Sequence, residues 1–435
     1  MRIHLKTLGC RLNEAELETW SRQFQAQGHR MTNDVEEADL LVVNTCAVTG
    51  EAVRKSRKLL GRASRQNPEA RLVVSGCYAS LDPGATAEAE GVDLVIDNRD
   101  KDRLVEIVSR ELDLTSMPQS SMEPDTTGLL ARGRQRAFIK VQDGCRYRCT
   151  YCIVTLARGE ERSRPAGEVI EEINRLHAEG IQEVVLTGVH IGGYGSDMGS
   201  NISELIRQVL AETEIPRLRI GSIEPWDLPP GFWSLFENPR FMPHLHLPLQ
   251  SGSDSVLRRM SRRCRTDEYL ELIRQARAEV PDFNVTTDII VGFPGETEDE
   301  WQQTLDVVQE IGFGHLHIFA FSPRQGTKAA ELPDPVSREL KRQRSEALHR
   351  LGESMKRSTA EVYLGRTLPI LIEGSGENGW SGYTPNFLRV QLAATPGVSL
   401  GNQIVDVQLN GISEDGQSLT AEPALSFNHR KISRQ

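Results

Sequence analysis

The sequence has few cysteines, no long apolar run and no excess of positive charge. Seven cysteines in 435 residues are too sparse for a disulfide scaffold, and an odd number cannot all pair within one chain. No segment approaches the roughly 18 consecutive apolar residues that a membrane-spanning helix needs. Residues 1–7 predict a strand, with no apolar signal-peptide core behind them. We therefore expect a cytoplasmic protein with no membrane partner.

The formal net charge of −10 argues against a protein that coats nucleic acids without selectivity, although a local basic groove stays possible. Hydrophobic residues make up 38% and charged residues 26% of the chain, as in ordinary globular proteins. A chain of 435 residues is too long for one hydrophobic core, so two or three domains are expected.

Strands and helices alternate through the first hundred or so residues. This alternation predicts an open parallel sheet covered by helices. The expected strands are residues 3–8, 40–43, 72–75 and 92–96, and the expected helices are residues 14–27, 52–65 and 101–112.

A second alternation of strands and helices begins near residue 137 and ends near residue 351. It contains six strand–helix units, which favour a full or partial (β/α) barrel with its chemistry on the loops after the strands. The expected strands are residues 138–142, 183–186, 217–220, 245–247, 285–291 and 316–319, and a charged helix is expected at residues 337–358.

From about residue 360 short β-like segments (residues 367–372, 388–392 and 403–408) are separated by Gly, Asn and Asp turns. They predict a small all-β barrel of roughly 70 residues. The predicted protein is therefore of the α/β class. Its predicted parts are an N-terminal domain at 1–113, a linker at 114–130, a central domain at 131–358 and a β domain at 359–435.

Six cysteines form two sets of three, and the second set carries the sharper signal. Cys145, Cys149 and Cys152, which we call the central triplet, follow the first expected barrel strand with Cys-x3-Cys-x2-Cys spacing. Thiolates suit iron–sulfur clusters, zinc or copper. Three cysteines leave one iron of a four-iron cluster open, whereas an electron carrier normally uses four cysteines. Structural zinc would need a fourth nearby ligand, and none follows within the next turn. We therefore predict a 4Fe–4S cluster with one open iron.

Cys10, Cys46 and Cys77, the N-terminal triplet, each follow an expected strand. Loops after parallel strands meet at one edge of a sheet, so these cysteines can come together. The alternative is that they are small buried hydrophobic residues. Gly9 and Gly76 favour a metal site, because glycine lets the backbone turn close to a cluster. Cys264 is left over and we expect it to be incidental.

The sequence around the central triplet, with Tyr151 before its last cysteine, resembles the hallmark of radical S-adenosylmethionine (SAM) enzymes. Further segments resemble radical SAM methylthiotransferases along almost the whole chain. They are residues 7–10 (TLGC), 44–46 (NTC), 75–77 (SGC), 157–159 (ARG), 162–165 (RSRP), 246–253 (HLPLQSGS), 288–297 (DIIVGFPGET) and 321–327 (FSPRQGT). The C-terminal segment resembles the RNA-binding TRAM domain of that family.

The resemblance implies that the central triplet holds a 4Fe–4S cluster whose open iron chelates SAM, and that reductive cleavage of SAM yields a radical. The N-terminal triplet would hold a second 4Fe–4S cluster, where sulfur is carried and methylated. The implied partners are a tRNA and a reducing protein such as a flavodoxin or ferredoxin; the sulfur donor stays unknown.

Residues near the ends of the expected barrel strands are candidates for contacts with SAM. Tyr151 is expected near the adenine, and the later strand ends near the ribose or the polar tail. For each of them an ordinary capping or packing role is the alternative. The candidates are Tyr151, Thr187, Gly188, Glu224, Gln250 and Asp288. His190 is expected to be a plain loop residue.

Basic residues gather in three groups, from which we expect phosphate contacts with RNA. A solvated helix face is the alternative, above all for the third group. The groups are Arg132, Arg134, Arg136 and Lys140; Arg146, Arg148, Arg158, Arg162 and Arg164; and Arg258, Arg259, Arg262, Arg263 and Arg265. In the last domain Trp380, Tyr383 and Phe387 could stack on bases or fill the barrel.

Three subgroups of methylthiotransferases compete. One acts on isopentenyladenosine in tRNA, one on N6-threonylcarbamoyladenosine at the same place (position 37, 3′ of the anticodon), and one on an aspartate of a ribosomal protein. Residues 7–13 (TLGCRLN), 44–49 (NTCAVT) and 187–192 (TGVHIG) resemble the threonylcarbamoyladenosine subgroup. A hypothesis of another class is an iron–sulfur electron-transfer or scaffold protein without turnover, which would need four cysteines at each cluster.

Overall fold

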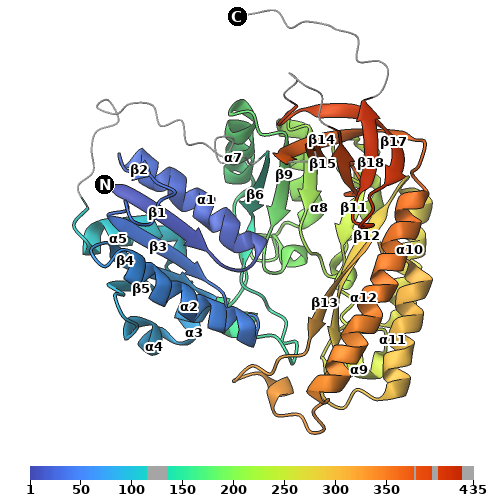
Figure 1. Cartoon of the computed structure of the whole chain (residues 1–435), viewed down its shortest axis with the longest axis horizontal. Coiled ribbons are helices and arrows are strands. Elements are labelled where there is room, and N and C mark those ends of the chain that lie inside the picture. Colours follow the sequence, from blue (N-terminus) through green and yellow to red (C-terminus); the bar gives the residue numbers. More distant parts are fainter. Residues whose placement is uncertain (115–134, 377–378, 394–399, 424–435) are drawn as a thin grey trace, which may run out of the picture.

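The computed structural model describes residues 1–114, 135–376, 379–393 and 400–423. The predicted linker at residues 114–130 lies outside them except for Leu114. Along the chain follow a five-stranded sheet, two three-stranded sheets and a closed five-stranded barrel (Figure 1). This arrangement confirms the predicted α/β class with a small C-terminal β barrel. The domain boundaries themselves stay predictions.

The N-terminal sheet is parallel, with strand order β2-β1-β3-β4-β5. Every residue of β3 is buried, as expected for a parallel strand covered on both faces. Its strands are β1 (Arg2–Thr7), β2 (Arg30–Met31), β3 (Leu40–Thr45), β4 (Arg71–Gly76) and β5 (Leu94–Ile96). Its helices are α1 (Arg11–Ala26), α2 (Gly50–Gln66), α3 (Cys77–Leu81), α4 (Pro83–Ala87), the 3-10 turn η1 (Lys101–Arg103) and α5 (Leu104–Glu111).

In the described residues of the central part, six parallel strands form two sheets, β10-β9-β6 and β11-β12-β13. Isolated parallel bridges from Leu218 to Phe241 and from Ser222 to His246 link the two sheets, so the six strands form one open arc. This is the expected partial barrel. Its strands are β6 (Arg136–Lys140), β9 (Glu183–Thr187), β10 (Arg217–Ile220), β11 (His244–His246), β12 (Asn284–Val291) and β13 (His315–Ala320).

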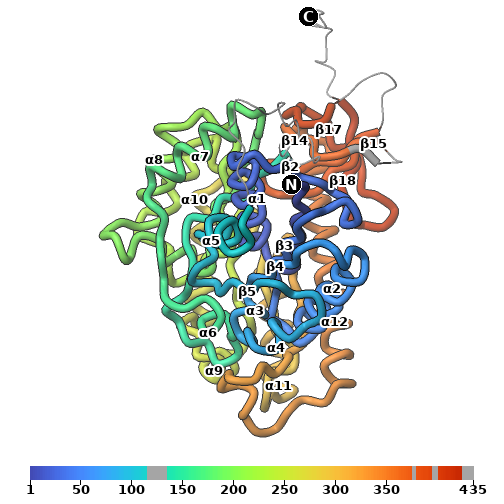
Figure 2. The backbone as a smooth tube through the Cα atoms, turned by 90° about the vertical axis from the view of Figure 1, so that its left-hand side faces the viewer, coloured from blue at the N-terminus to red at the C-terminus, as the bar shows by residue number. Residues whose placement is uncertain are grey.

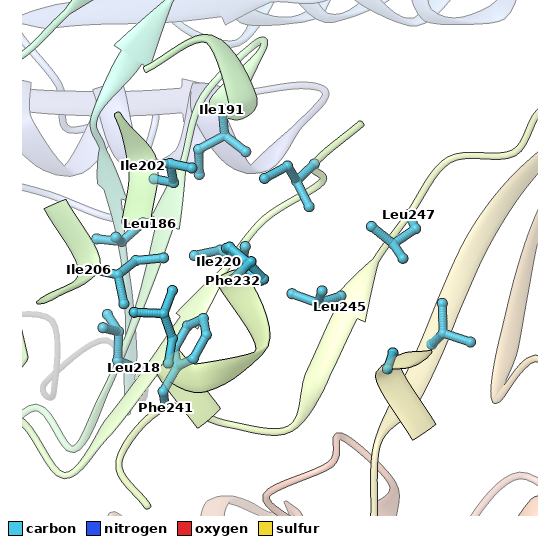
Figure 3. Packing of buried hydrophobic residues seen from close by; sticks show 14 of the residues in the cluster. Leu186, Ile191, Ile202, Ile206, Leu218, Ile220, Phe232, Phe241, Leu245 and Leu247 are labelled. Atoms are coloured by element: carbon cyan, nitrogen blue, oxygen red, sulfur yellow. The ribbon is translucent and has the colours of Figure 1, made fainter. Parts of the chain in front are cut away.

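Helices follow the strands of the arc and cover its outer face. The largest hydrophobic cluster lies between them; Figure 3 shows Leu186, Leu218 and Ile220 of the strands facing Ile202 and Ile206 of α8. The helices of the outer face are α7 (Ala166–Ala178), α8 (Ile202–Glu212), α10 (Thr266–Glu279), α11 (Glu298–Ile311) and α12 (Arg338–Glu361). Helix α6 (Val154–Arg158) packs against α3 instead, and α9 (Asp254–Arg259) belongs to a separate cluster with Ile290 and Phe293. Shorter pieces are β7 (Gln142–Asp143), β8 (Arg162–Ser163), η3 (Ile191–Gly193), η4 (Pro225–Asp227), η5 (Phe232–Glu237) and η6 (Lys328–Ala330).

Helix α1 lies against the inner face of the arc. Ala15 of α1 packs with Phe138 of β6 and Val185 of β9, whereas the neighbours Ala137 and Ile139 belong to the outer core. Successive side chains of a strand point to opposite faces, so α1 covers the inner one. Figure 1 shows α1 beside β6, and Figure 2, turned so that the N-terminal part faces the viewer, shows β3, β4 and β5 in the foreground.

The C-terminal barrel closes in the order β14-β15-β16-β18-β17. Its core is aliphatic, with Ile370, Val390 and Val407 fully buried. Its strands are β14 (Thr367–Gly376), β15 (Gly379–Tyr383), β16 (Arg389–Leu392), β17 (Ile404–Ile412) and β18 (Leu419–Pro423). Among the residues described, none of the helices has the length and apolar character required to cross a membrane.

Candidate functional site

The loop that carries the central triplet follows β7 and is fixed at both ends by backbone hydrogen bonds. The N–H of Cys145 donates to the carbonyl of Gly159 over 3.1 Å, and that of Thr150 donates to the carbonyl of Met260, just after α9, over 3.0 Å. At Gly144 φ is +73° and a Cβ would lie 1.8 Å from a backbone oxygen across the loop. Only glycine fits there, so the chain enters the loop at one defined place.

The three thiols of the central triplet lie close enough to influence one another. Burial, assisted by the neighbouring thiol of Cys149, raises the pKa of Cys145 to about 11 and that of Cys152 to about 12. Burial also raises the pKa of Cys149. Buried thiols of this kind are protonated at neutral pH unless a metal compensates their charge. The donor set therefore fits the iron atoms of a cluster.

A buried guanidinium connects this loop to the third strand of the arc. Arg262 binds Glu224 through both nitrogens, with Nη1–Oε1 at 2.9 Å and Nη2–Oε2 at 2.7 Å, and lies 4.4 Å from the ring centroid of Trp226. Arg262 also opposes the burial that raises the pKa of Cys149. Its side chain is 1% exposed, so both expectations for Arg262, a phosphate contact and a solvated face, are wrong. Glu224 lies at the site, but both of its carboxylate oxygens already bind Arg262.

Two of the other candidates from the sequence lie beside the same loop. Tyr151 packs against a cluster that includes Met260 and Phe293, and burial holds its pKa well above the usual value. The carbonyl of Thr187 already accepts a hydrogen bond from the N–H of Val141 over 2.9 Å. A contact between this carbonyl and SAM would need its second lone pair, and the predicted role stays a prediction.

The remaining candidates are Gly188, which follows β9, and the pair of Gln250 and Asp288, at β12. A Cβ on Gly188 would lie 2.9 Å from Oε1 of Gln142. The N–H of Gln250 donates to the carbonyl of Asp288 over 2.9 Å, and Gln250 has φ +74°, an uncommon conformation for a residue other than glycine. Asp288 Oδ1 lies 3.2 Å from Nε2 of His246. The structure thus brings Gln250 and Asp288 together; their roles toward SAM stay predictions.

His190 is more than a loop residue. Its Nε2 lies 2.5 Å from Oδ2 of Asp227 and its Nδ1 contacts the carboxylate of Glu161. Tyr147, inside the central triplet's loop, donates to Asp227 over 2.7 Å and packs edge-on against His190, with ring centroids 4.5 Å apart. Burial lowers the pKa of His190, but the two carboxylates outweigh it and the net shift is upward. The two carboxylates thus favour the charged form of His190, and its contacts with them and with Tyr147 support the loop.

The N-terminal triplet lies at the carboxyl edge of the N-terminal sheet. Cys10 precedes α1, Cys46 follows β3 and Cys77 begins α3. Gly9 has φ +119°, and a Cβ there would lie 2.9 Å from Sγ of Cys46. Gly76 has φ +100°, and a Cβ there would lie 2.3 Å from the carbonyl oxygen of Thr45. Both glycines are thus required for the backbone to pass this closely, as the sequence indicated.

The thiols of the N-terminal triplet also influence one another. Surrounding protein raises the pKa of Cys10 and Cys46, and Cys77 raises both further. No three His, Cys, Asp or Glu side chains surround a single-ion site in the part of the chain that the structure describes. In a four-iron cluster each thiolate binds a different iron, so its ligands stand farther apart than around one ion. The donor set of soft thiols fits such a cluster.

A buried polar network joins the two triplets. Arg158, six residues after Cys152, binds Glu16 and Asp143 at 2.9 Å each and donates to Oδ1 of Asn13 over 2.8 Å. Asn13 in turn donates to the carbonyl of Leu8, just after β1, over 2.7 Å and to that of Thr45, the last residue of β3, over 3.2 Å, which holds the loops of the N-terminal triplet. Further members of the network are Asn44, Lys101 and Lys140.

The expected basic groups divide between the inside and the surface. Four members are buried in ion pairs, so the prediction of phosphate contacts is wrong for Arg136, Lys140, Arg158 and Arg262. For Arg136 and Lys140 the cause is strand alternation, which turns both side chains of β6 toward buried acids; Arg158 and Arg262 pair with acids that are distant in sequence. Five members are exposed: Arg146, Arg148, Arg258, Arg263 and Arg265. Arg162 and Arg164 are intermediate, Arg259 pairs with Glu300, and Arg132 and Arg134 lie outside the described residues.

Two aromatic residues of the C-terminal barrel pack against the arc. Tyr383 and Phe387 stack with centroids 4.7 Å apart, and Phe387 stacks on His244 at 4.8 Å and lies 5.0 Å from the guanidinium of Arg219. The third, Trp380, packs against the core of the barrel. These contacts dock the barrel onto one end of the arc.

The sequence missed the residues that support the loops. Glu161, Asp227 and Asn98 belong to them; Asn98 donates to the carbonyl of Ala157 over 2.7 Å and lies 3.9 Å from Sγ of Cys77. No spacing rule connects such residues, because their partners are distant in sequence. The only available signal was the excess of polar residues directly after apolar strands.

Comparison with family models matches two parts of the chain. Residues 139–308 match the "Radical SAM superfamily", and residues 2–97 match the "Uncharacterized protein family UPF0004". Among solved structures, the radical SAM methyltransferase TsrM from Kitasatospora setae superposes with a TM-score of 0.58 at 15% identity, covering 76% of this chain and 77% of that one. At this identity the likeness concerns the fold.

Curated relatives match nearly the whole chain. The threonylcarbamoyladenosine tRNA methylthiotransferases MtaB of Chlamydia pneumoniae and Bacillus subtilis are 36% and 34% identical to it, covering 95% and 90% of this chain and 96% and 90% of their own lengths. A tRNA-2-methylthio-N(6)-dimethylallyladenosine synthase of Bacillus pumilus is 34% identical, covering 94% of this chain and 83% of its own length. With one third of the residues shared along nearly the full chain, the protein belongs to the radical SAM tRNA methylthiotransferase family.

Proposed function

We propose that this enzyme converts N6-threonylcarbamoyladenosine, 3′ of the tRNA anticodon, to its 2-methylthio derivative. The observation that carries the proposal is the share of each relative's own length that this chain covers. The chain covers 90%, 95% and 96% of three relatives named for threonylcarbamoyladenosine, but only 79–83% of the dimethylallyladenosine synthases. Identity alone does not separate the subgroups, since it is 34% to both kinds of Bacillus relative.

The family's chemistry uses a 4Fe–4S cluster and SAM, and Cys145, Cys149 and Cys152 would hold that cluster. A second 4Fe–4S cluster on Cys10, Cys46 and Cys77 is part of the proposal. It is supported by three thiols that influence one another's pKa and by Gly9 and Gly76, whose positive φ lets the backbone pass close to Cys46 and Thr45. When bound, the cluster supplies the electron, SAM the radical and the methyl group, and the second cluster the sulfur.

The chain's own residues position these groups and exclude water. Arg262 would hold the loop of the central triplet against Glu224, and Arg158 would fix the distance between the two triplets. Helix α1 closes the inner face of the arc near β6, which shields a reactive species there from solvent. Tyr151, Thr187, Gly188, Glu224, Gln250 and Asp288 are proposed as the surroundings of SAM.

The RNA would approach from the exposed side of the central loop. Exposed arginines that flank the loop support this, because they can neutralise phosphates; Arg146, Arg148 and Arg263 are the nearest to it in sequence or by contact. The C-terminal barrel would contribute further RNA contacts, as its TRAM-like character suggests. A flavodoxin or ferredoxin would supply the electrons.

The decisive experiment is mass spectrometry of nucleosides from tRNA treated anaerobically with the reconstituted, reduced enzyme and SAM. The RNA carries both threonylcarbamoyladenosine and isopentenyladenosine. A methylthio product on the threonylcarbamoyl nucleoside alone is expected. A product on the isopentenyl nucleoside alone would overturn the subgroup. If neither forms while 5′-deoxyadenosine accumulates, the substrate proposal falls, and an aspartate of a ribosomal protein becomes the next candidate.

A further inference from the structure

An arginine without an acidic partner stands at the first position of α1. Arg11 directly follows Cys10 and is exposed. Arg2 and Arg22, which precede and follow it in the chain, each form ion pairs with acids within 4.0 Å. Among the described residues no acid forms such an ion pair with Arg11. Its guanidinium lies 4.7 Å from the ring centroid of Phe138 on β6. The cation thus rests on an aromatic face that turns toward the inside of the arc.

The opposite end of the arc presents side chains toward the same space. On β13, Leu316 is buried and packs near Gly352 of α12 at the outer face. The residues that alternate with it, His315, His317 and Phe319, are exposed and therefore point to the inner face. Arg11 acts electrostatically on His317, so both side chains face the same space on the inner side of the arc, Arg11 from α1 and His317 from β13.

Two acids near Arg11 or His317 are engaged elsewhere. Glu373 of β14 interacts electrostatically with Arg11, but its carboxylate binds Arg136. Asp288, which lies opposite His317 in the pairing of β12 with β13, pairs with His246. The surrounding protein lowers the pKa of His317, as does the neighbouring His246; both favour the neutral imidazole, which can donate a hydrogen bond. One uncompensated cation and a neutral donor are what a carboxylate requires.

The position of Arg11 suits a contact with the substrate. Arg11 adjoins a member of the N-terminal triplet and faces the inner side of the arc, at whose carboxyl end the central triplet lies. A base that receives sulfur from one triplet and radical chemistry from the other must lie between them. The threonylcarbamoyl group on such a base ends in a carboxylate, whereas a dimethylallyl group carries no charge.

We propose that Arg11, assisted by His317, binds the carboxylate of the threonylcarbamoyl group and thereby selects this nucleoside over a dimethylallyl one. The inference rests on the proposed function. Arg11 would both favour the threonylcarbamoyl nucleoside and disfavour the dimethylallyl one, because the uncharged dimethylallyl group would leave Arg11 desolvated and unpaired.

The test compares R11Q and R11K with the parent enzyme and with R62Q. Arg62 is an exposed arginine in the last turns of α2, so R62Q controls for the loss of one surface charge. Each reconstituted protein is assayed for kcat and KM on tRNA carrying threonylcarbamoyladenosine and on tRNA carrying isopentenyladenosine. Cluster content by iron and sulfide analysis, and 5′-deoxyadenosine formed without RNA, report on the integrity of the metal sites.

For R11Q we expect kcat/KM on the threonylcarbamoyl tRNA to fall on the order of 30-fold, mostly through KM, with clusters and RNA-independent 5′-deoxyadenosine unchanged. R11K should recover much of the loss, and activity on isopentenyl tRNA should not fall. R11Q behaving like R62Q would overturn the inference while leaving the proposed function intact. Failure of the parent enzyme to modify threonylcarbamoyl tRNA would overturn both.

Discussion

Arg158 and Glu16 form a buried ion pair, with 2.9 Å between Nη1 and Oε1, across 142 residues of sequence. Both side chains are at most 3% exposed. The pair joins the helix that follows the central triplet to the helix that follows Cys10. Asp143 binds the same nitrogen at 2.9 Å, so one guanidinium bridges two buried carboxylates, which Lys101 and Lys140 also contact. Removing one member of a buried ionic network is costly because its hydrogen-bond partners, here Glu16, Asp143 and Asn13, lose a bond that water cannot replace.

Replacement of Arg158 by methionine, R158M, should therefore lower the free energy of unfolding by about 3–5 kcal/mol. Chemical denaturation of the anaerobically reconstituted protein measures the effect. The control is R103M, because Arg103 and Glu106 form an exposed pair at 2.8 Å whose loss should cost less than about 1 kcal/mol. Equal effects of the two substitutions would contradict the role assigned to Arg158.

The burial of Arg158 could not be predicted from the sequence, although much of the fold could. The cysteine spacing and the strand–helix alternation predicted the partial barrel, the N-terminal parallel sheet and the small β barrel, because these features depend on local periodicity. The burial of Arg158 depends on Glu16 and Asp143, which no local pattern connects to it. The short strands β2, β15 and β18 and the short helices α3 and α4 were missed for a similar reason. Two to five residues are too few to show a period.

Loss of a cysteine from one triplet should affect different products from loss of a cysteine from the other. Replacement of Cys149 by alanine should abolish both 5′-deoxyadenosine formation and methylthio transfer, because the central triplet would lose a ligand. Replacement of Cys46 by alanine should leave 5′-deoxyadenosine formation largely intact and abolish methylthio transfer. Each variant should bind about half the iron of the parent protein.

Iron analysis and product quantification on the same preparations check this, and C264A serves as the matched control, since Cys264 is a buried thiol outside both triplets. If C46A retained full iron and full transfer activity, the second cluster would have to be abandoned.

His190 gives the loop of the central triplet a dependence on pH. Its pKa is raised by Asp227 and Glu161, although burial opposes them. A raised pKa means that the stabilisation is fully present below the unfolded pKa of about 6.5 and is lost as pH rises through the folded value. H190Q should therefore destabilise the protein by about 1–3 kcal/mol at pH 6 and by less at pH 9.

Thermal unfolding of the reconstituted protein at both pH values measures this difference, with H349Q as control because His349 is exposed. A penalty for H190Q that is the same at pH 6 and pH 9 would show that the imidazole is not charged between its carboxylates.

Gly76 should be indispensable for the N-terminal triplet, because of both its conformation and its surroundings. With φ at +100°, a Cβ would lie 2.3 Å from the carbonyl oxygen and 2.5 Å from the nitrogen of Thr45. Backbone atoms cannot swing aside as a flexible side chain can, so G76A must shift β3 or the turn into α3. We expect a loss of more than about 2 kcal/mol in stability and a selective loss of iron from the N-terminal triplet.

The matched substitution is G84A, one helix further along, where a Cβ would meet nothing within 4 Å. Alanine at this exposed position of α4 should leave stability unchanged or raise it by up to about 1 kcal/mol. Denaturation and iron analysis of both variants separate the effects, and 5′-deoxyadenosine formation by G76A reports on the central triplet. If G76A kept the iron content and stability of G84A, the close packing of Gly76 against Thr45 would not be what positions Cys77.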